Sequence, residues 1–192
     1  MFHHFHRNAS ALLCAVAACF ALPAAQAHVT LEQQTAQAGS TYKAVFRATH
    51  GCNGSPTTAF TVFLPPGFVG GKPMPKPGWK LDIQTEKLDK PYDSHGVQIG
   101  ERAVSFRWSG GRLLDAEYDE FIVRVTLPAE AGKRWIRVLQ QCEQGQNDWA
   151  EIPVEGKPRP AQPAALLDIL PAASVAVPTP VAPASPGAHH HH

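Results

Sequence analysis

Short runs of alternating or β-branched apolar residues recur between residues 28 and 154 and predict strands. Sequences rich in glycine and proline separate the runs, as at residues 65–67 and 108–111, and no uninterrupted amphipathic stretch reaches helical length. This pattern predicts an all-β fold, an antiparallel β-sandwich. The predicted strands occupy residues 28–31, 41–48, 59–64, 79–84, 103–108, 120–127, 134–140 and 148–154.

Composition limits the size of the fold and the class of partner. The chain has 192 residues, of which 44% are hydrophobic and 17% charged, as expected for one globular domain. Because 17 basic residues nearly balance 16 acidic ones, no basic surface is expected, and nucleic acid is not an expected partner.

The first 27 residues have the pattern of a secretory signal peptide. Arg7 precedes an apolar run over residues 9–22, and Ala25 to Ala27 form the small-x-small cleavage motif. Cleavage between Ala27 and His28 would make the protein periplasmic or secreted. The run is too short to remain as a membrane helix, so the mature chain is expected to have no transmembrane segment. The alternative is a lipoprotein-type cleavage before Cys19.

The composition changes after Gly156. We therefore expect one domain over residues 28–157 and a disordered tail, rich in proline and alanine, over residues 158–192. The chain ends with His189 to His192, which are either a native metal-collecting tail or the remnant of an expression tag; the sequence is compatible with both.

Two cysteines, Cys52 and Cys142, remain after removal of the leader. An even pair in an oxidising compartment predicts a disulfide. The loop between the two residues is long enough that the bond is expected to stabilise the fold by about 4 to 5 kcal/mol. The alternative, a thiolate metal pair, lacks the short C-x-x-C spacing of such sites.

Cleavage would also create a metal ligand at His28. The α-amino group and the imidazole Nδ1 of an N-terminal histidine close a six-membered chelate ring, and nitrogen donors in this arrangement favour Cu(II). Both groups must lose protons to bind, so affinity is expected to fall below about pH 6. The alternative is a histidine that follows the cleavage site by accident.

Further ligands are few. Outside the leader and the tail, the other histidines are His50 and His95. His50 lies two positions before Cys52, so a disulfide would hold its loop near Cys142, whereas His95 is expected to be solvated in a polar turn. With Met74 as the one methionine left, a thioether site for Cu(I) is not expected.

Several motifs in the same order resemble the YcnI-like family of exported copper-binding domains. The resemblance covers residues 28–153 and implies an immunoglobulin-like or cupredoxin-like sandwich that binds Cu(II) through one N-terminal histidine, with a tryptophan beside the metal. The motifs are HVTL at residues 28–31, AG at 38–39, PKPGW at 75–79, WSGG at 108–111, EF at 120–121, QCEQG at 141–145 and DW at 148–149.

The resemblance assigns roles residue by residue. It implies that His28 is the N-terminal ligand and that Trp149 shields the metal. Where the family has a glutamate near the end of the second strand, this chain has ATHGC over residues 48–52, and we expect His50 to replace that ligand. Gln141 is a candidate to orient a metal ligand by hydrogen-bonding to it without contacting the metal itself.

The expected function is Cu(II) storage, buffering or delivery, with other periplasmic copper chaperones or a membrane copper importer as partners. No nucleophile, zinc-protease or phosphate-loop motif supports a hydrolase or kinase, so an enzyme is not expected. Two alternatives remain. One is a copper-dependent monooxygenase, and the other is a structural or adhesive sandwich domain with an incidental N-terminal histidine.

Overall fold

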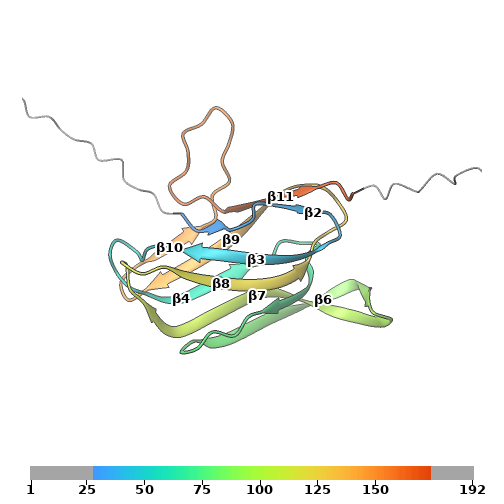
Figure 1. Cartoon of the computed structure of the whole chain (residues 1–192), viewed down its shortest axis with the longest axis horizontal. Coiled ribbons are helices and arrows are strands. Elements are labelled where there is room, and N and C mark those ends of the chain that lie inside the picture. Colours follow the sequence, from blue (N-terminus) through green and yellow to red (C-terminus); the bar gives the residue numbers. More distant parts are fainter. Residues whose placement is uncertain (1–27, 174–192) are drawn as a thin grey trace, which may run out of the picture.

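The computed structural model describes residues 28–173, which form two packed β-sheets (Figure 1). The predicted signal peptide and His189 to His192 lie outside the described residues. Within them, each of the predicted runs overlaps a strand, although the run 148–154 does so only at Asp148 and Trp149, and the all-β sandwich predicted from the sequence is confirmed. Between residues 28 and 173 there is no helix long and apolar enough to cross a lipid bilayer.

One sheet has four strands and the other has seven. The four-stranded sheet has the order β1 (Thr30–Leu31), β3 (Thr41–Ala48), β8 (Asp119–Thr126) and β5 (Val69–Pro73). The second sheet has the order β2 (Thr35–Gln37), β11 (Ala165–Leu170), β9 (Gly132–Cys142), β4 (Thr57–Phe63), β7 (Val97–Leu113) and β6 (Lys80–Ser94), and β10 (Gln146–Trp149) also pairs with β9. All pairs are antiparallel except β11 with β2.

Aromatic side chains from both sheets meet in the core. Phe60 of β4 stacks on Phe121 of β8 with ring centroids 4.0 Å apart, and this contact joins the two sheets. Trp108 of β7 meets Phe121 edge-on and is fully buried. In a sandwich, the apolar side chains on the inner faces of the two sheets form the core, and aromatic contacts of this kind fill it.

The domain does not end at residue 157. Residues 165–170, which the sequence assigned to the disordered tail, form β11 and pair antiparallel with β9. Leu167 and Ile169 are completely buried, so β11 supplies part of the core. The apolar run is short and lies between Pro163 and Pro171, and the strand obtains its hydrogen bonds from partners distant in sequence.

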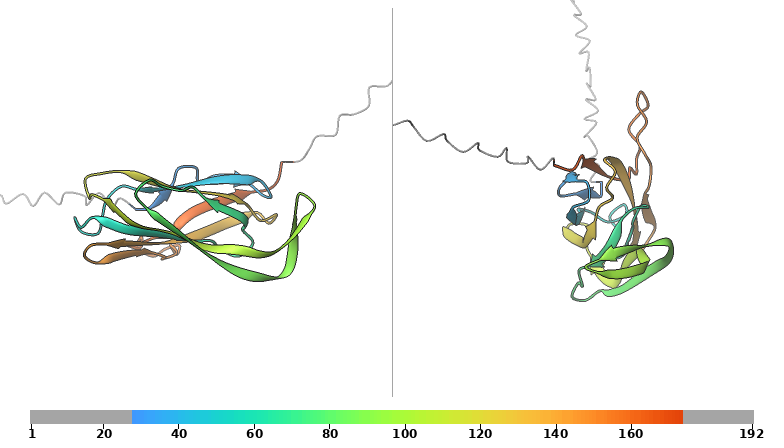
Figure 2. Two further views of the ribbon diagram at one scale, coloured as in Figure 1. Left: turned by 90° about the horizontal axis from the view of Figure 1, so that it is seen from below. Right: turned by 90° about the vertical axis from the view of Figure 1, so that its right-hand side faces the viewer.

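Strands β6 and β7 form a long hairpin that continues past the edge of the sandwich and curls to one side (Figure 2). Its outer part pairs Tyr92 with Ile99 and turns at His95 and Gly96, both with positive φ. His95 is exposed in this turn, as expected from the sequence.

Tyr42 of β3 holds the segment between β1 and β2 by donating a hydrogen bond from its hydroxyl to the carbonyl of Gln33. Burial, and then the nearby charge of Glu32, raise the pKa of Tyr42 to about 12. The folded state therefore holds this proton more tightly than the unfolded chain, whose tyrosine pKa is about 10. The resulting stability is fully present below about pH 10 and is lost as pH rises to about 12.

We predict that Tyr42→Phe flattens the alkaline fall in stability, because the substituted ring has no proton to lose. Urea unfolding of both proteins at intervals between pH 8 and pH 12 measures the effect. The parent should lose more stability than the variant above pH 10. Parallel curves for the two proteins would show that Tyr42 does not control this transition.

Candidate metal centre

Strand pairing brings His28 next to His50. Thr30 of β1 lies opposite Arg47 of β3, and the same antiparallel register continued by two residues places His28 opposite Thr49. The neighbouring Val29 is buried in the core and anchors this end of the chain. His28 itself is buried, with 8% of its surface exposed. The first residue of the predicted mature chain is thus fixed against the sandwich.

Both histidines pack around one tryptophan. The ring centroid of Trp149 lies 5.8 Å from that of His28 and 6.0 Å from that of His50, and each imidazole meets the indole at an interplanar angle of 78°. Trp149 is 4% exposed. The structure therefore brings together the three residues that the sequence placed at a metal site, and they come from three separate segments of the chain.

The hydrogen bonding of His50 fixes its tautomer. Its Nδ1 lies 2.5 Å from the carbonyl oxygen of Gly51, and a carbonyl only accepts, so Nδ1 carries the proton and donates. In a neutral imidazole the Nε2 then has the lone pair that a metal needs. A ring nitrogen that donates to a backbone carbonyl is the usual support for a histidine ligand.

Gln140 of β9 connects the elements of this cluster. Its Nε2 donates to the carbonyl of His50 at 2.6 Å and to Thr57 Oγ1 at 2.8 Å. Its Oε1 accepts from the Trp149 indole at 3.1 Å and from Asn147 Nδ2 at 3.3 Å. Because Gln140 is only 1% exposed, these bonds form in a poorly solvated interior, where they fix the positions of His50 and Trp149.

The structure places Gln140, and not Gln141, in hydrogen-bond contact with His50 and Trp149. Side chains alternate between the faces of a strand, so Gln140 points into the sandwich and Gln141 points out. The side-chain oxygen of Gln141 accepts a hydrogen bond from Arg107 on the outer face of the second sheet. The structure does not bring Gln141 into the contacts of Trp149 described above.

We predict that Gln140→Leu destabilises the domain by about 3 kcal/mol, because the substitution leaves the carbonyl of His50 and the indole of Trp149 buried without this partner. Urea unfolding measures the loss. Gln141→Leu, one residue away on the outer face, is the matched control and should cost less than about 1 kcal/mol. Equal losses for both variants would remove the argument for a network centred on Gln140.

The predicted disulfide between Cys52 and Cys142 is confirmed, with Cα atoms 6.0 Å apart, and the alternative of a thiolate metal pair is thereby excluded. The bond ties the His50 loop to the end of β9. In the same loop a Cβ atom added to Gly51 would lie 1.9 Å from the carbonyl oxygen of Ser55, so only glycine fits there. The amide of Gly51 also donates to Asp115 at 2.9 Å.

The side chains alone do not complete a metal site. Among residues 28–173, no group of three or more histidine, cysteine, aspartate or glutamate side chains is placed to hold a metal ion. The two imidazoles beside Trp149 can hold copper only with a further donor. The α-amino group that cleavage before His28 would produce is a nitrogen donor of the required kind.

A cavity of about 190 Å³ is lined by His28 and by Pro153, Arg159 and Pro163 of the segment between β10 and β11. This segment rises as a loop above the sandwich in Figure 1. Trp135 and Leu166 contribute apolar surface to the cavity, and Arg159 contributes a positive charge. A small molecule or a side chain of a partner can therefore approach the segment that begins at His28.

Known proteins resemble this chain in sequence family and in fold. No curated protein shows significant similarity. Among solved structures, an uncharacterised protein from Nocardia farcinica with an immunoglobulin-like fold is 23% identical, with a TM-score of 0.58 over 74% of this chain and 97% of that chain. The seventh ScaB type I cohesin from Pseudobacteroides cellulosolvens is 10% identical, with a TM-score of 0.30 over 86% of this chain and 97% of that chain.

The family model covers nearly the whole of the described domain. It is described as a domain of unknown function, DUF1775, and it matches residues 28–169, from the buried His28 to the penultimate residue of β11. The match therefore includes both sheets and every residue of the cluster around Trp149. The chain belongs to the DUF1775 family.

Proposed function

We propose that the mature protein is an exported Cu(II)-binding protein that stores, buffers or delivers copper. In this proposal cleavage between Ala27 and His28 exposes an α-amino group. That amine and the imidazole of His28 bind the ion together with the imidazole of His50, and Trp149 limits access of water. The protein binds copper as cargo and does not use it for catalysis.

The observation that supports the proposal most strongly is the packing of His28 and His50 against the same buried indole. Two neutral imidazoles and an amine form an all-nitrogen donor set, which Cu(II) binds more tightly than other divalent first-row metals do. The tautomer of His50 leaves Nε2 as its ligating atom. The site has no thiolate, since both cysteines of the domain are in the disulfide.

Delivery to another copper-handling protein fits the position of the cluster. Three donors leave at least one position of a tetragonal ion for a ligand from outside. A cavity lined by His28 lies next to the cluster, although neither His50 nor Trp149 lines it. We propose periplasmic copper chaperones or a membrane copper importer as the partners that exchange the ion.

Titration of the protein beginning at His28 with Cu(II), in competition with a chelator of known affinity, tests the proposal. We expect one equivalent to bind at pH 7.5 and to raise the melting temperature, because a ligand that binds only the folded state stabilises it. Below about pH 6 binding should weaken, since protons compete for the amine and the imidazoles. Zn(II) should bind less tightly. An unchanged melting temperature with excess Cu(II) would contradict the proposal.

A further inference from the structure

Three cations lie in a row on the outer face of the four-stranded sheet. Lys43 of β3 and Lys72 of β5 are both cross-strand partners of Arg124 in β8, and all three side chains are exposed. Neighbouring strands are about 4.8 Å apart, so the row is about 10 Å long. Like charges placed directly opposite one another destabilise a sheet. The row is therefore a cost to folding that packing does not explain.

Another cation on the same face, Arg47, is paired with carboxylates. Arg47 of β3 lies opposite Glu120 of β8, with 3.7 Å between Nε and Oε1, and it also pairs with Glu32 at 2.8 Å. In contrast, within the described residues neither Lys43, Lys72 nor Arg124 takes part in an ion pair. Among residues 28–173, the side chain of Arg124 bonds to Thr41 Oγ1 alone, at 3.5 Å.

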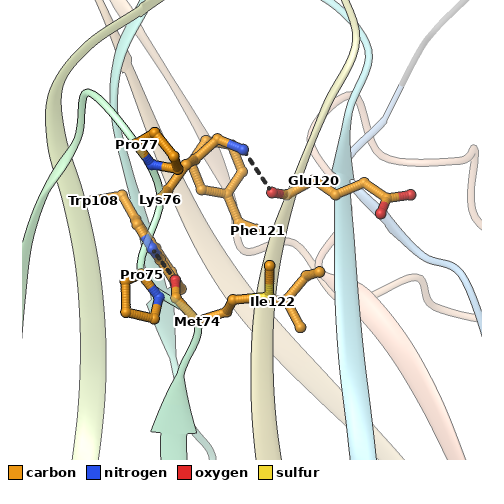
Figure 3. A pocket seen from close by; sticks show the side chains of 8 residues that line it. All are labelled: Met74, Pro75, Lys76, Pro77, Trp108, Glu120, Phe121 and Ile122. Carbon is orange, nitrogen blue, oxygen red and sulfur yellow. Dashed lines mark hydrogen bonds between the residues drawn. The ribbon is translucent and has the colours of Figure 1, made fainter.

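The row lies at the centre of an elongated groove made of three adjoining cavities. The middle cavity, of about 340 Å³, is lined by the three cations together with Met74 and Ile122. Met74 and Ile122 also line a cavity of about 80 Å³ whose walls include Trp108 and Phe121 (Figure 3).

A third cavity continues the groove on the other side of the row. It measures about 350 Å³, shares Lys72 and Arg124 with the middle one, and is walled by Tyr92 and His95 from the tip of the β6–β7 hairpin. Asp93 also lines it, and its carboxylate accepts hydrogen bonds from Gly96 and Gln98 within the hairpin itself. The groove follows β5 and its extension over residues 70–76, which corresponds to about 20 Å of extended chain.

We propose that this groove binds an extended acidic peptide segment of a partner protein. Carboxylates of the segment lie over Lys43, Arg124 and Lys72 and remove their mutual repulsion. An apolar side chain of the segment enters the cavity beside Met74, which is 56% exposed and forms an apolar end to the groove. This inference does not depend on copper, because the groove contains none of the proposed ligands.

The shape and composition of the groove favour a peptide over a small anion. A compact anion would occupy the middle cavity and leave the apolar end in water, whereas about six extended residues reach both. The segment binds through its side chains and does not extend the sheet, because Pro73 has no amide proton and the β5 register is interrupted between Val69 and Lys72.

The experiment is fluorescence anisotropy with a labelled eight-residue peptide that has three consecutive glutamates between two leucines. We expect saturable binding that weakens with added salt. Replacing the cations together (Lys43→Gln, Lys72→Gln, Arg124→Gln) should weaken binding at least tenfold. The matched control replaces three exposed lysines elsewhere (Lys87→Gln, Lys90→Gln, Lys133→Gln) and should bind within about twofold of the parent.

Peptide variants and a small anion complete the test. A peptide with glutamines in place of the glutamates should not bind, and one with glycines in place of the leucines should bind more weakly than the original. Equal binding to both triple variants would overturn the proposal. So would inorganic tripolyphosphate that binds the groove as tightly as the peptide, because the ligand would then be a small anion. Circular dichroism and melting curves show that each variant is folded, and the triple cation variant should melt no lower than the parent.

Discussion

Replacing His28 with alanine is expected to lower the affinity for Cu(II) by about a thousandfold, or about 4 kcal/mol. The substitution removes one imidazole and also opens the chelate ring that the imidazole forms with the α-amino group. His50→Ala removes one donor and leaves the chelate intact, so it should cost less, about ten- to a hundredfold. Chelator competition at pH 7.5 measures the Cu(II) affinity of the parent and of both variants, each prepared to begin at residue 28.

His95→Ala is the matched control for both substitutions. His95 is exposed in the turn of the β6–β7 hairpin, away from Trp149, and its removal should not change Cu(II) affinity. The melting temperature of each metal-free variant separates loss of a ligand from loss of the fold. If His28→Ala binds Cu(II) as tightly as His95→Ala does, His28 is not a ligand.

Removing the disulfide is expected to have the largest effect on stability. The bond joins Cys52 and Cys142 across a sequence separation of 90, so the unfolded chain gains much conformational freedom when both residues are replaced by serine. The loop-closure model gives a loss of about 4 to 5 kcal/mol. Urea unfolding of the double variant, compared with the oxidised parent, measures it. A loss below about 1 kcal/mol would show that the bond contributes little to the fold.

The same variant should also bind Cu(II) less tightly, because the disulfide holds the loop that carries His50. Gln140 still bonds to the carbonyl of His50, so the loss in affinity should be smaller than that of His50→Ala. Measurements at low temperature, where the double variant is folded, separate the two effects. Equal Cu(II) affinity with and without the disulfide would show that Gln140 holds His50 in position without help from the disulfide.

Most of the sandwich was predictable because β8 and β9 alternate between buried and more exposed positions and β4 is a short, almost continuously buried apolar run. Strand β5 was not predicted, since it contains Gly70 and Gly71 and ends at Pro73. The structure explains why residue 71 is glycine, because a Cβ atom there would lie 2.8 Å from Cζ of Phe106. The outer part of the β6–β7 hairpin has few apolar residues and is mostly exposed, so it has no regular hydrophobic pattern. β11 obtains its partners from residues distant in sequence.

The residues of the candidate site were predictable in part. An N-terminal histidine after a cleavage motif, and a second histidine next to a cysteine, identified His28 and His50. Gln140 was missed, although it continues the alternation of the buried Ile136 and Val138 in β9. A polar residue at a buried position of a strand must find hydrogen-bond partners, so a glutamine at position 140 indicates a buried hydrogen-bond network. Choosing Gln141 instead placed the side chain on the opposite face.

The most direct test of the central claim is electron paramagnetic resonance of the protein with one equivalent of Cu(II). One preparation begins at His28 and the other carries one additional residue before it. If the α-amino group binds the ion together with the imidazoles of His28 and His50, the first preparation gives a nitrogen-rich tetragonal spectrum that the second loses. Identical spectra from the two preparations would contradict the account, because the amine would then not be a ligand.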